Sequence, residues 1–422
     1  MRFLKLVVLI LVFTQGLYAT LSCHQPFREE LEKRSLQYFL DHTHQRTGLV
    51  LDRAPNLDPK SSVNPYAMAS IAATGFGIAV LANAAEKGIL SKKETIEKIA
   101  RTLRFALQSM KRYRGWFYHF VDWETGARWK GCEISTIDTA LFIAGALYSA
   151  EALQSETLRE LSNKLYSDLD FIDMMTDGGK KMGRKTLSMG WTPEHGYLPY
   201  HWDQYAEHLL LVLLGLGHPK NPLPLDAWTA WKRQTFSIGS VKVIGPELPL
   251  FAHQYSGLFF DFRRIATDKE DFFTNSVRGT DFNREACKLL ERKFITFREG
   301  FWGVSASDSK EGYFAFSPME TDGTVCPACV GASAFYAPCP ILSDLETWSK
   351  GKYSEKIWGH YGFTDSFNLD KNWVDSDVIG ITVGALYLSL ANTSTKSALW
   401  NNFHSNPAIQ KAEEKIKMIL EN

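Results

Sequence analysis

The sequence predicts an all-α fold, an (α/α)6 toroid or barrel whose long loops form a cleft at one rim. About twelve helical segments follow one another along the 422 residues. Segments with one apolar face alternate with segments that are apolar all round, as expected for an outer ring wrapped around a buried inner ring. Loops longer than about 15 residues, rich in Gly, Trp and acids, separate several segments. Loops of this length in a compact domain usually have a function, such as lining a binding cleft.

The one-faced segments that we assign to the outer ring are residues 27–42, 91–111, 157–174, 224–235, 268–293 and 341–350. The largely apolar segments that we assign to the buried inner ring are 65–85, 135–153, 203–217, 250–264, 325–337 and 378–390, and a charged helix at 407–419 closes the chain. Ser91 and Glu94 form a capping box at the start of one outer helix. Residues 115–129 are β-like, with a turn at 124–126.

Acidic residues stand at the start of several inner helices. Successive helices of a toroid are antiparallel, so all inner helices run the same way and their first turns meet at one rim. Asp138 opens the fourth helix, Glu207 the sixth and Asp377 the twelfth. Loops 115–134, 176–202, 295–324 and 352–375 are expected to wall a cleft above them.

Two carboxyl groups across a cleft are what glycosidic bond cleavage needs, because one donates a proton to the leaving oxygen and the other activates water. Glu207 suits the acid, since Leu210 and Leu211 would desolvate it and raise its pKa. The positive end of the helix would act in the opposite direction. An inverting reaction requires the two carboxyl groups to be about 6.5–9.5 Å apart.

Each acid also has a structural interpretation. Ser135 and Asp138 resemble a capping box with Asp in place of Glu. Asp203 and Asp375 are expected to be N-caps. An acid at Asp377 in a first turn is favoured by the helix dipole in any protein.

The composition excludes other classes. Basic and acidic residues number 47 each, so the chain offers no electrostatic reason to bind nucleic acid. No Gly-x-Ser-x-Gly or phosphate-binding loop occurs, and the histidines at 195, 201 and 208 have no metal-ligand spacing. We therefore expect no metal and no cofactor. Aromatic residues, 13% of the chain, can stack on sugar rings, although most should fill the core.

The first 22 residues have the layout of a secretory signal peptide, with Arg2 and Lys5 before an apolar run, so residues 23–422 form a single exported domain, periplasmic or secreted. Lipidation of Cys23 is an alternative that we do not favour, because Thr20 stands where lipoprotein signals carry Leu. No later segment is long and apolar enough to be an integral membrane span. Cys326 and Cys329 have redox or zinc spacing, but export favours a structural disulfide or buried thiols.

Several motifs together resemble one family. They are GWFYHFVDWETG (115–126), STIDTAL (135–141), YAE (205–207), LFAHQY (250–255), DFR (261–263), WGVSASD (302–308), DGTV (322–325) and YGFTDSFN (361–368). In this order they are similar to the glycoamylase-like domain family, which includes the endo-β-1,2-glucanases of glycoside hydrolase family 144. The resemblance runs from about residue 27 to 392.

The resemblance implies an (α/α)6 toroid that hydrolyses a β-linked glucan, with β-1,2-glucan favoured, by inversion and without a metal. Glu207 matches the general acid, Asp377 the candidate base, and Asp138 a catalytic or substrate-contacting acid. The residues expected to contact the oligo- or polysaccharide are Tyr118, His119, Asp122, Trp202, Tyr205, His253, Gln254, Asp308, Asp322 and Asp365. We expect a monomer.

The chain departs from the family in one place. Characterised glucanases carry Glu at the position of Asp138 and Asp at that of Ser135, which bears on linkage specificity more than on hydrolysis. Two alternatives therefore stay open: an exo-acting α-glucosidase of the glucoamylase type, and a non-catalytic glycan-binding toroid.

Overall fold

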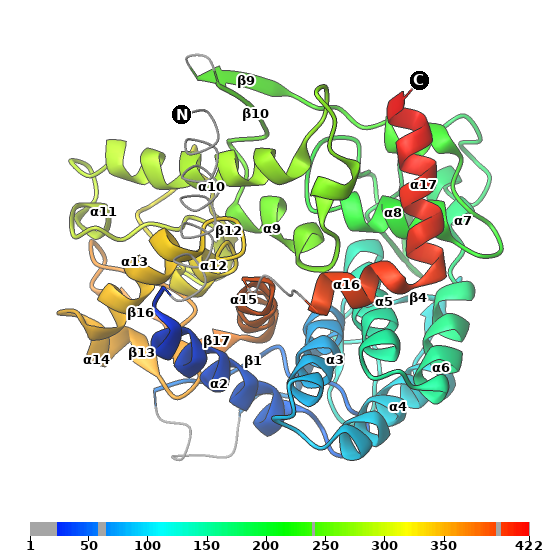
Figure 1. The fold of residues 1–422 in the computed structure, drawn as a ribbon, viewed down its shortest axis with the longest axis horizontal. Helices are drawn as coiled ribbons and strands as arrows, with labels where there is room; N and C mark the ends of the chain where they lie inside the picture. Colours follow the sequence, from blue (N-terminus) through cyan, green and yellow to red (C-terminus); the bar gives the residue numbers. More distant parts are fainter. Residues whose placement is uncertain (1–22, 58–64, 239–240, 394–397, 422) are drawn as a thin grey trace, which may run out of the picture.

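The computed structural model describes residues 23–57, 65–238, 241–393 and 398–421, so the expected signal peptide at 1–22 lies outside the described residues. Six buried helical segments form a closed inner ring, in which each contacts the next and the last returns to the first. They are α3 (Ile71–Glu86), α5 (Thr136–Ala152), α8 (Leu209–Gly217), α9 (Leu250–Phe259), α12 (Pro327–Gly331) and α15 (Gly380–Asn392). Figure 1 shows α15 end-on near the middle of the molecule. The toroid predicted from the sequence is confirmed.

Helices α3 and α5 pack closely because small residues face each other. A Cβ atom added at Gly145 would lie 2.1 Å from the carbonyl oxygen of Gly75, and one added at Gly75 would lie 2.4 Å from the Cα atom of Phe142. Any side chain here would push the helices apart. The alanine-rich sequence of the two helices thus sets the width of this side of the ring.

The outer helices each bury one face against the ring. They are α2 (Gln25–His42), α4 (Lys92–Gln108), α6 (Glu156–Ser167), α10 (Phe272–Leu289) and α13 (Pro338–Lys350). In α4 the buried face is Thr95, Ile99, Leu103 and Ala106 at helical spacing, and Ser91 caps the helix by accepting a hydrogen bond from the backbone N–H of Glu94.

The outer helix predicted at 224–235 is wrong. This segment forms a 3-10 turn, η1 (Leu225–Trp228), followed by strand β9 (Thr235–Ile238). The guanidinium of Arg233 donates to the backbone carbonyls of Trp228 at 2.8 Å and Trp231 at 3.0 Å. These two carbonyls therefore accept hydrogen bonds from a side chain instead of the backbone hydrogen bonds of an α-helix. Helix α17 (Pro407–Glu421) covers α8 in this part of the outer ring instead.

One end of the ring is closed by α16 (Ala398–Ser405), which the sequence analysis did not predict. Trp400 donates to the carbonyl of Gly257 in α9 at 2.9 Å, and Asn402 donates to Glu86 at the end of α3 at 2.7 Å. Asn406 donates to Glu151 near the end of α5 at 3.2 Å. Because these partners lie toward the carboxyl ends of inner helices, the opposite end of the ring is the open mouth.

Short antiparallel strand pairs line that mouth and lead into the inner helices. Strand β2 (Met68–Ser70) precedes α3 and pairs with β5 (Phe120–Asp122), and β17 (Asp377–Ile379) precedes α15 and pairs with β1 (Arg53–Pro55). Strand β6 (Ile134–Ser135) precedes α5 and pairs with β7 (Gly190–Thr192). The remaining elements are β3 (Arg112–Tyr113), β4 (Trp116–Phe117), α7 (Phe171–Thr176), β8 (Gly196–Tyr197), β10 (Val241–Ile244), η2 (Phe262–Ile265), α11 (Ile295–Arg298), β11 (Ala306–Ser307), β12 (Phe314–Ala315), α14 (Ser354–Ile357), β13 (Trp358–Gly359), β14 (Gly362–Phe363), β15 (Phe367–Asn368) and β16 (Trp373–Val374).

Four of the six cysteines form disulfides. Cys326 is bonded to Cys329 at the start of α12, and Cys23 is bonded to Cys339 in α13. Cys132 and Cys287 are free thiols. Of the two interpretations that the sequence left open for the Cys326 pair, the structure has the disulfide and not the buried thiols. Among the described residues, none of the helices combines the length and apolar character that crossing a membrane requires.

Candidate active site

Glu207 lies at the mouth of the ring, directly before α8. The helix begins at Leu209, and its N-cap position is His208, so the predicted helix start at 203 and the predicted cap at Asp203 are wrong. Ser256 of α9 holds this junction, because its hydroxyl donates to the carbonyl of Glu207 at 2.5 Å and accepts from the N–H of Leu210 at 2.9 Å. Helix α9 therefore fixes the backbone that carries the Glu207 carboxyl group.

Burial raises the pKa of the half-buried Glu207 carboxyl group to about 7, and the negative charge of Asp138 adds to the rise. The charge of Asp138 therefore reaches Glu207, as expected if the starts of the inner helices meet at one mouth. A backbone hydrogen bond at Glu207 acts in the opposite direction and lowers the pKa, and Glu207 precedes the helix without capping it.

Asp138 belongs to the first turn of α5. Ser135 is the N-cap and accepts a hydrogen bond from the backbone N–H of Asp138, while its hydroxyl also donates to the Asp138 carboxylate. The predicted capping arrangement is therefore present. Ser135 contacts only one carboxylate oxygen of Asp138, so the other oxygen is available to His119, whose Nε2 lies 3.4 Å away.

His119 is held between two carboxylates. Its Nδ1 lies 2.9 Å from Glu133, and its Nε2 faces Asp138. Burial lowers the pKa of His119, but the charge of Asp138 and the contact with Glu133 outweigh it and raise the pKa to about 9. His119 is therefore an imidazolium at neutral pH, and it ties Asp138 to Glu133.

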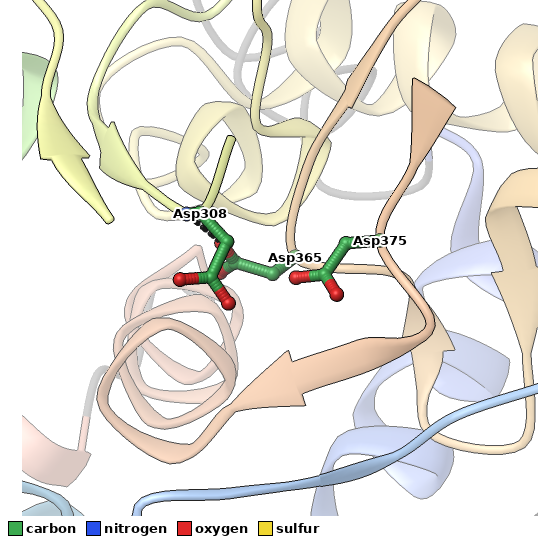
Figure 2. Close-up of side chains that lie close together, drawn as sticks. All are labelled: Asp308, Asp365 and Asp375. Carbon is green, nitrogen blue, oxygen red and sulfur yellow. Dashed lines mark hydrogen bonds between the residues drawn. The ribbon is translucent and has the colours of Figure 1, made fainter. Parts of the chain in front are cut away.

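A second group of acids lies at the start of α15. Figure 2 shows Asp308, Asp365 and Asp375, and one carboxylate oxygen of each lies within 4.8 Å of the others. Asp377 is next to them: its carboxylate accepts hydrogen bonds from the hydroxyls of Tyr66 and Ser376. We call Asp308, Asp365 and Asp375 the aspartate cluster.

The predicted placements of Asp375 and Asp377 need correction. Helix α15 begins at Gly380 with Ile379 at the N-cap, so Asp375 is not a cap and Asp377 is not in the first turn. Asp377 lies on β17, where pairing with Pro55 of β1 fixes it. The helix dipole therefore does not explain either acid.

Arg53 lies between the two groups of acids. Its guanidinium is 2.5 Å from Asp308 and 3.3 Å from the neighbouring Asp52. Burial raises the pKa of Asp52 although Arg53 counteracts the rise, and the charge of His119 acts on the same carboxyl group. Asp52 and Arg53 thus connect the Asp138 side of the mouth to the aspartate cluster.

Two tyrosines lie near both groups of acids. Burial raises the pKa of Tyr255, and the charges of Glu207, Asp365 and Asp138 raise it further. Desolvation and the charges of Asp365 and Asp138, among other acids, raise the pKa of Tyr313, although 57% of its surface is exposed. Acids of both groups therefore lie within electrostatic range of these two tyrosines.

A pocket opens beside Asp308 in the loop between β11 and α12. Aromatic side chains form much of its wall together with acids, and the lining includes Glu311, Tyr313, Phe314, Phe316 and Asp322. Flat rings with acidic neighbours suit the apolar faces and hydroxyl edges of sugars. Asp322 is held there by Lys371 at 2.6 Å.

Other predicted sugar contacts have structural roles. Gln254 has no exposed surface and donates to the Cys329 carbonyl, and its contact with sugar stays a prediction. His253 and Tyr205 are nearly buried and bonded to each other at 3.2 Å. Trp202 is also nearly buried and donates to a threonine hydroxyl at 3.0 Å.

Asp122 and Tyr118 lie near the mouth but are already engaged. Asp122 accepts hydrogen bonds from the backbone and hydroxyl groups of Thr125 and so shapes the turn after β5. The ring of Tyr118 is covered by Arg128, whose guanidinium carbon is 5.0 Å from the ring centroid. These contacts support the β-like turn that the sequence predicted.

Sequence analysis missed several members of the site: Asp52, Arg53, Tyr66, Glu133 and Tyr255. Glu133 lies two residues before the recognised cap at Ser135, so its closeness to the site could have been inferred. Arg53 had no such signal, because its partner Asp308 is 255 residues away.

The ring of inner helices, with acids gathered at one mouth, defines a glycoamylase-like α/α toroid. Residues 199–407 match the model of the Glycoamylase family, described as "Putative glucoamylase". This match confirms the family resemblance that the motifs predicted.

Individual proteins are similar over most of the chain. The exo beta-1,2-glucooligosaccharide sophorohydrolase (non-reducing end) of Parabacteroides distasonis is 23% identical over 92% of this chain, which spans 57% of that relative's length. The endo-beta-1,2-glucanase of Chitinophaga pinensis, solved with sophorotriose and glucose, superposes with a TM-score of 0.82 and 22% identity, covering 93% of this chain and 97% of that one. A beta-1,2-glucanase of Parabacteroides distasonis superposes with a TM-score of 0.83 and 20% identity, and the match covers 93% of this chain and 60% of that one. These structures share the fold.

Proposed function

We propose that this chain is a glycoside hydrolase that cleaves a β-linked glucan, β-1,2-glucan being favoured, with inversion at the anomeric carbon. The observation that carries the proposal is Glu207, a carboxyl group at the mouth whose pKa of about 7 keeps about half of it protonated at neutral pH. An acid that must donate a proton to a glycosidic oxygen needs this property.

Glu207 is the proposed general acid, and Asp138 assists it. The charge of Asp138 helps keep the proton on Glu207, and His119 holds Asp138 in place. As the bond between the anomeric carbon and the leaving oxygen breaks, the proton of Glu207 passes to that oxygen. The positive charge that develops on the sugar ring is then stabilised by the carboxylates around the mouth.

Asp377 is the proposed general base. Both of its carboxylate oxygens accept hydroxyl hydrogen bonds, from Tyr66 and Ser376, and these hydrogen bonds orient the carboxylate that would take a proton from water. Water attacking from the Asp377 side, opposite Glu207, would invert the anomeric configuration.

The choice of linkage rests on the relatives. The curated relative is named for exo action on β-1,2-glucooligosaccharides, and the Chitinophaga structure is named an endo-β-1,2-glucanase. The linkage is therefore proposed as β-1,2, and the assay below measures whether the products come from chain ends or from the interior.

Export is proposed as well. Disulfides persist in oxidising compartments and are rare in the cytosol, and the described residues contain two of them. The bond between Cys23 and Cys339 also occupies the sulfur that a lipid would modify. The mass of the mature protein from a periplasmic or culture fraction would test both points, because an N-terminus at Cys23 without added lipid is expected.

The activity test uses purified protein with linear β-1,2-glucan, maltodextrin and other glucans. We expect new reducing ends from β-1,2-glucan, and proton NMR of the first products should show the α-anomer. Glu207→Gln should lower turnover by about 10²–10⁴-fold while leaving glucan binding intact. Glu160→Gln, an exposed change on the outer face of α6, is the matched control and should retain full turnover.

Each other outcome has a defined reading. Release of glucose from maltodextrin, with none from β-1,2-glucan, would support the α-glucosidase alternative. Binding of glucan without any reducing ends from the wild type would overturn the hydrolase proposal.

A further inference from the structure

The aspartate cluster collects three carboxyl groups from three separate loops. Asp308 follows β11, Asp365 lies between β14 and β15, and Asp375 follows β16. All three are at least 92% buried, and Asp365 is 99% buried. Figure 2 shows the three carboxyl groups directed toward one another.

The cluster contains acceptors that no described residue satisfies. Asp365 accepts the backbone N–H of Asp308 at 3.0 Å with Oδ2, but its Oδ1 has no hydrogen-bond partner among the described residues. Asp375 accepts the N–H of Asp377 at 3.1 Å with Oδ1, and its Oδ2 likewise has no partner there. Buried carboxylate oxygens without donors are costly, so each calls for an explanation.

The charges of the cluster are not balanced either. Three ionised carboxylates contribute −3, and Arg53, the one cation among the described residues that contacts them, contributes +1, which leaves −2. Arg53 is moreover shared with Asp52.

We propose that Asp308, Asp365 and Asp375 bind one hard divalent cation, Ca²⁺ before Mg²⁺. The spacing fits, because oxygens that share a cation at about 2.3–2.6 Å lie at most about 5 Å apart. Carboxylates are the ligands that such cations prefer. Ca²⁺ accepts several carboxylates in irregular geometry, whereas Mg²⁺ keeps most of its water and needs a near-ideal octahedron.

Such an ion would fix the mouth. It would join the loop after β11, which carries Tyr313, to the two loops before α15, which lead to Asp377. The ion would also supply the positive charge that the two unbonded oxygens lack. This inference does not rest on the proposed hydrolase activity, because binding is measured directly and without a sugar.

The experiment measures metal content and affinity on the full mature chain. Protein stripped with a chelator is titrated with CaCl₂ and separately with MgCl₂ by calorimetry at pH 7.5, and bound metal is counted after dialysis. We expect one Ca²⁺ per chain, weaker Mg²⁺ binding, and a higher Tm with Ca²⁺. Asp375→Asn, which removes the charge behind an unbonded oxygen, should weaken Ca²⁺ binding at least tenfold.

Asp177→Asn is the matched control. Asp177 is also buried and also has an unbonded oxygen, but Lys181 and Arg184 lie 3.1 and 3.2 Å away and balance its charge. This variant should bind Ca²⁺ like the wild type. If Asp375→Asn does not fold, Asp308→Asn replaces it with the same expectation.

Two outcomes would overturn the proposal. One is the absence of bound Ca²⁺ and Mg²⁺ in the wild type at millimolar concentration, which would leave shared protons as the means by which the cluster is neutralised. The other is Ca²⁺ binding that Asp375→Asn and Asp308→Asn leave unchanged, because the ion would then lie elsewhere.

Discussion

Replacing Asp138 by Asn should move the alkaline limb of the pH–rate profile to lower pH. Burial and the charge of Asp138 raise the pKa of Glu207 from 4.5 to about 7. A shift of about 2.5 units corresponds to about 3 kcal/mol, and at pH 7 it changes the protonated fraction from about one in 300 to about one half. Removing the like charge of Asp138 lowers the pKa of Glu207, so the limb should move to lower pH. The limb should stay above the ordinary value, because burial is the larger cause.

The assay is kcat/KM for the glucan that the wild type cleaves, measured from pH 4 to 9. Only the position of the limb is compared, because Asp138 also influences the height of the curve. Asp138→Glu retains the charge and should keep the limb near that of the wild type. A limb that is unchanged or moves upward in Asp138→Asn would refute the electrostatic link between the two acids.

Three further predictions concern stability. Because the folded-state pKa of Asp365 is raised to about 7, the stabilising effect of its protonated form is complete below the unfolded pKa and is lost as the pH rises to about 7. Chemical denaturation of the chelated protein should show the free energy of unfolding falling by about 1.4 kcal/mol per pH unit over this range. Asp365→Asn should reduce this slope, whereas equal slopes would contradict the raised pKa. Gly145→Ala should cost about 1–3 kcal/mol in urea unfolding, because the new methyl group meets the α3 backbone, and an unchanged midpoint would show that the helices can separate freely. Trp400→Ala should cost about 3–5 kcal/mol by the same measurement if α16 closes the ring as described, and a cost below 1 kcal/mol would argue against that role.

The ring itself could be predicted because its signal is local. In α8 every residue from Leu209 to Gly217 is apolar or glycine and buried, whereas α4 shows polar residues between apolar ones at helical spacing. These patterns are set by neighbours in the chain, and they decide which helices go inside. The helix predicted at 224–235 does not form, and hydropathy could not show the local cause. The guanidinium of Arg233 donates hydrogen bonds to backbone carbonyls that a helix would use.

The candidate site could be predicted only in part. Glu207 and Asp138 were found because each stands at the start of a buried helix, where a carboxyl group is conspicuous. The same rule placed Asp377 and Asp375 wrongly in or at a helix, because a strand that pairs with β1 separates them from α15. Strand pairing with a segment more than 300 residues away leaves no mark in the local sequence.

By itself, the sequence determined the number and order of the inner helices and the end of the ring at which their acids gather, and it made Glu207 the candidate acid. Only the tertiary structure decided that Arg53 meets Asp308, that His119 links Glu133 to Asp138, and that three aspartates from separate loops converge. The physical reason is the range of the interactions. Helical periodicity is written in consecutive residues, whereas the charge around a buried carboxyl group depends on which distant loops meet when the ring closes.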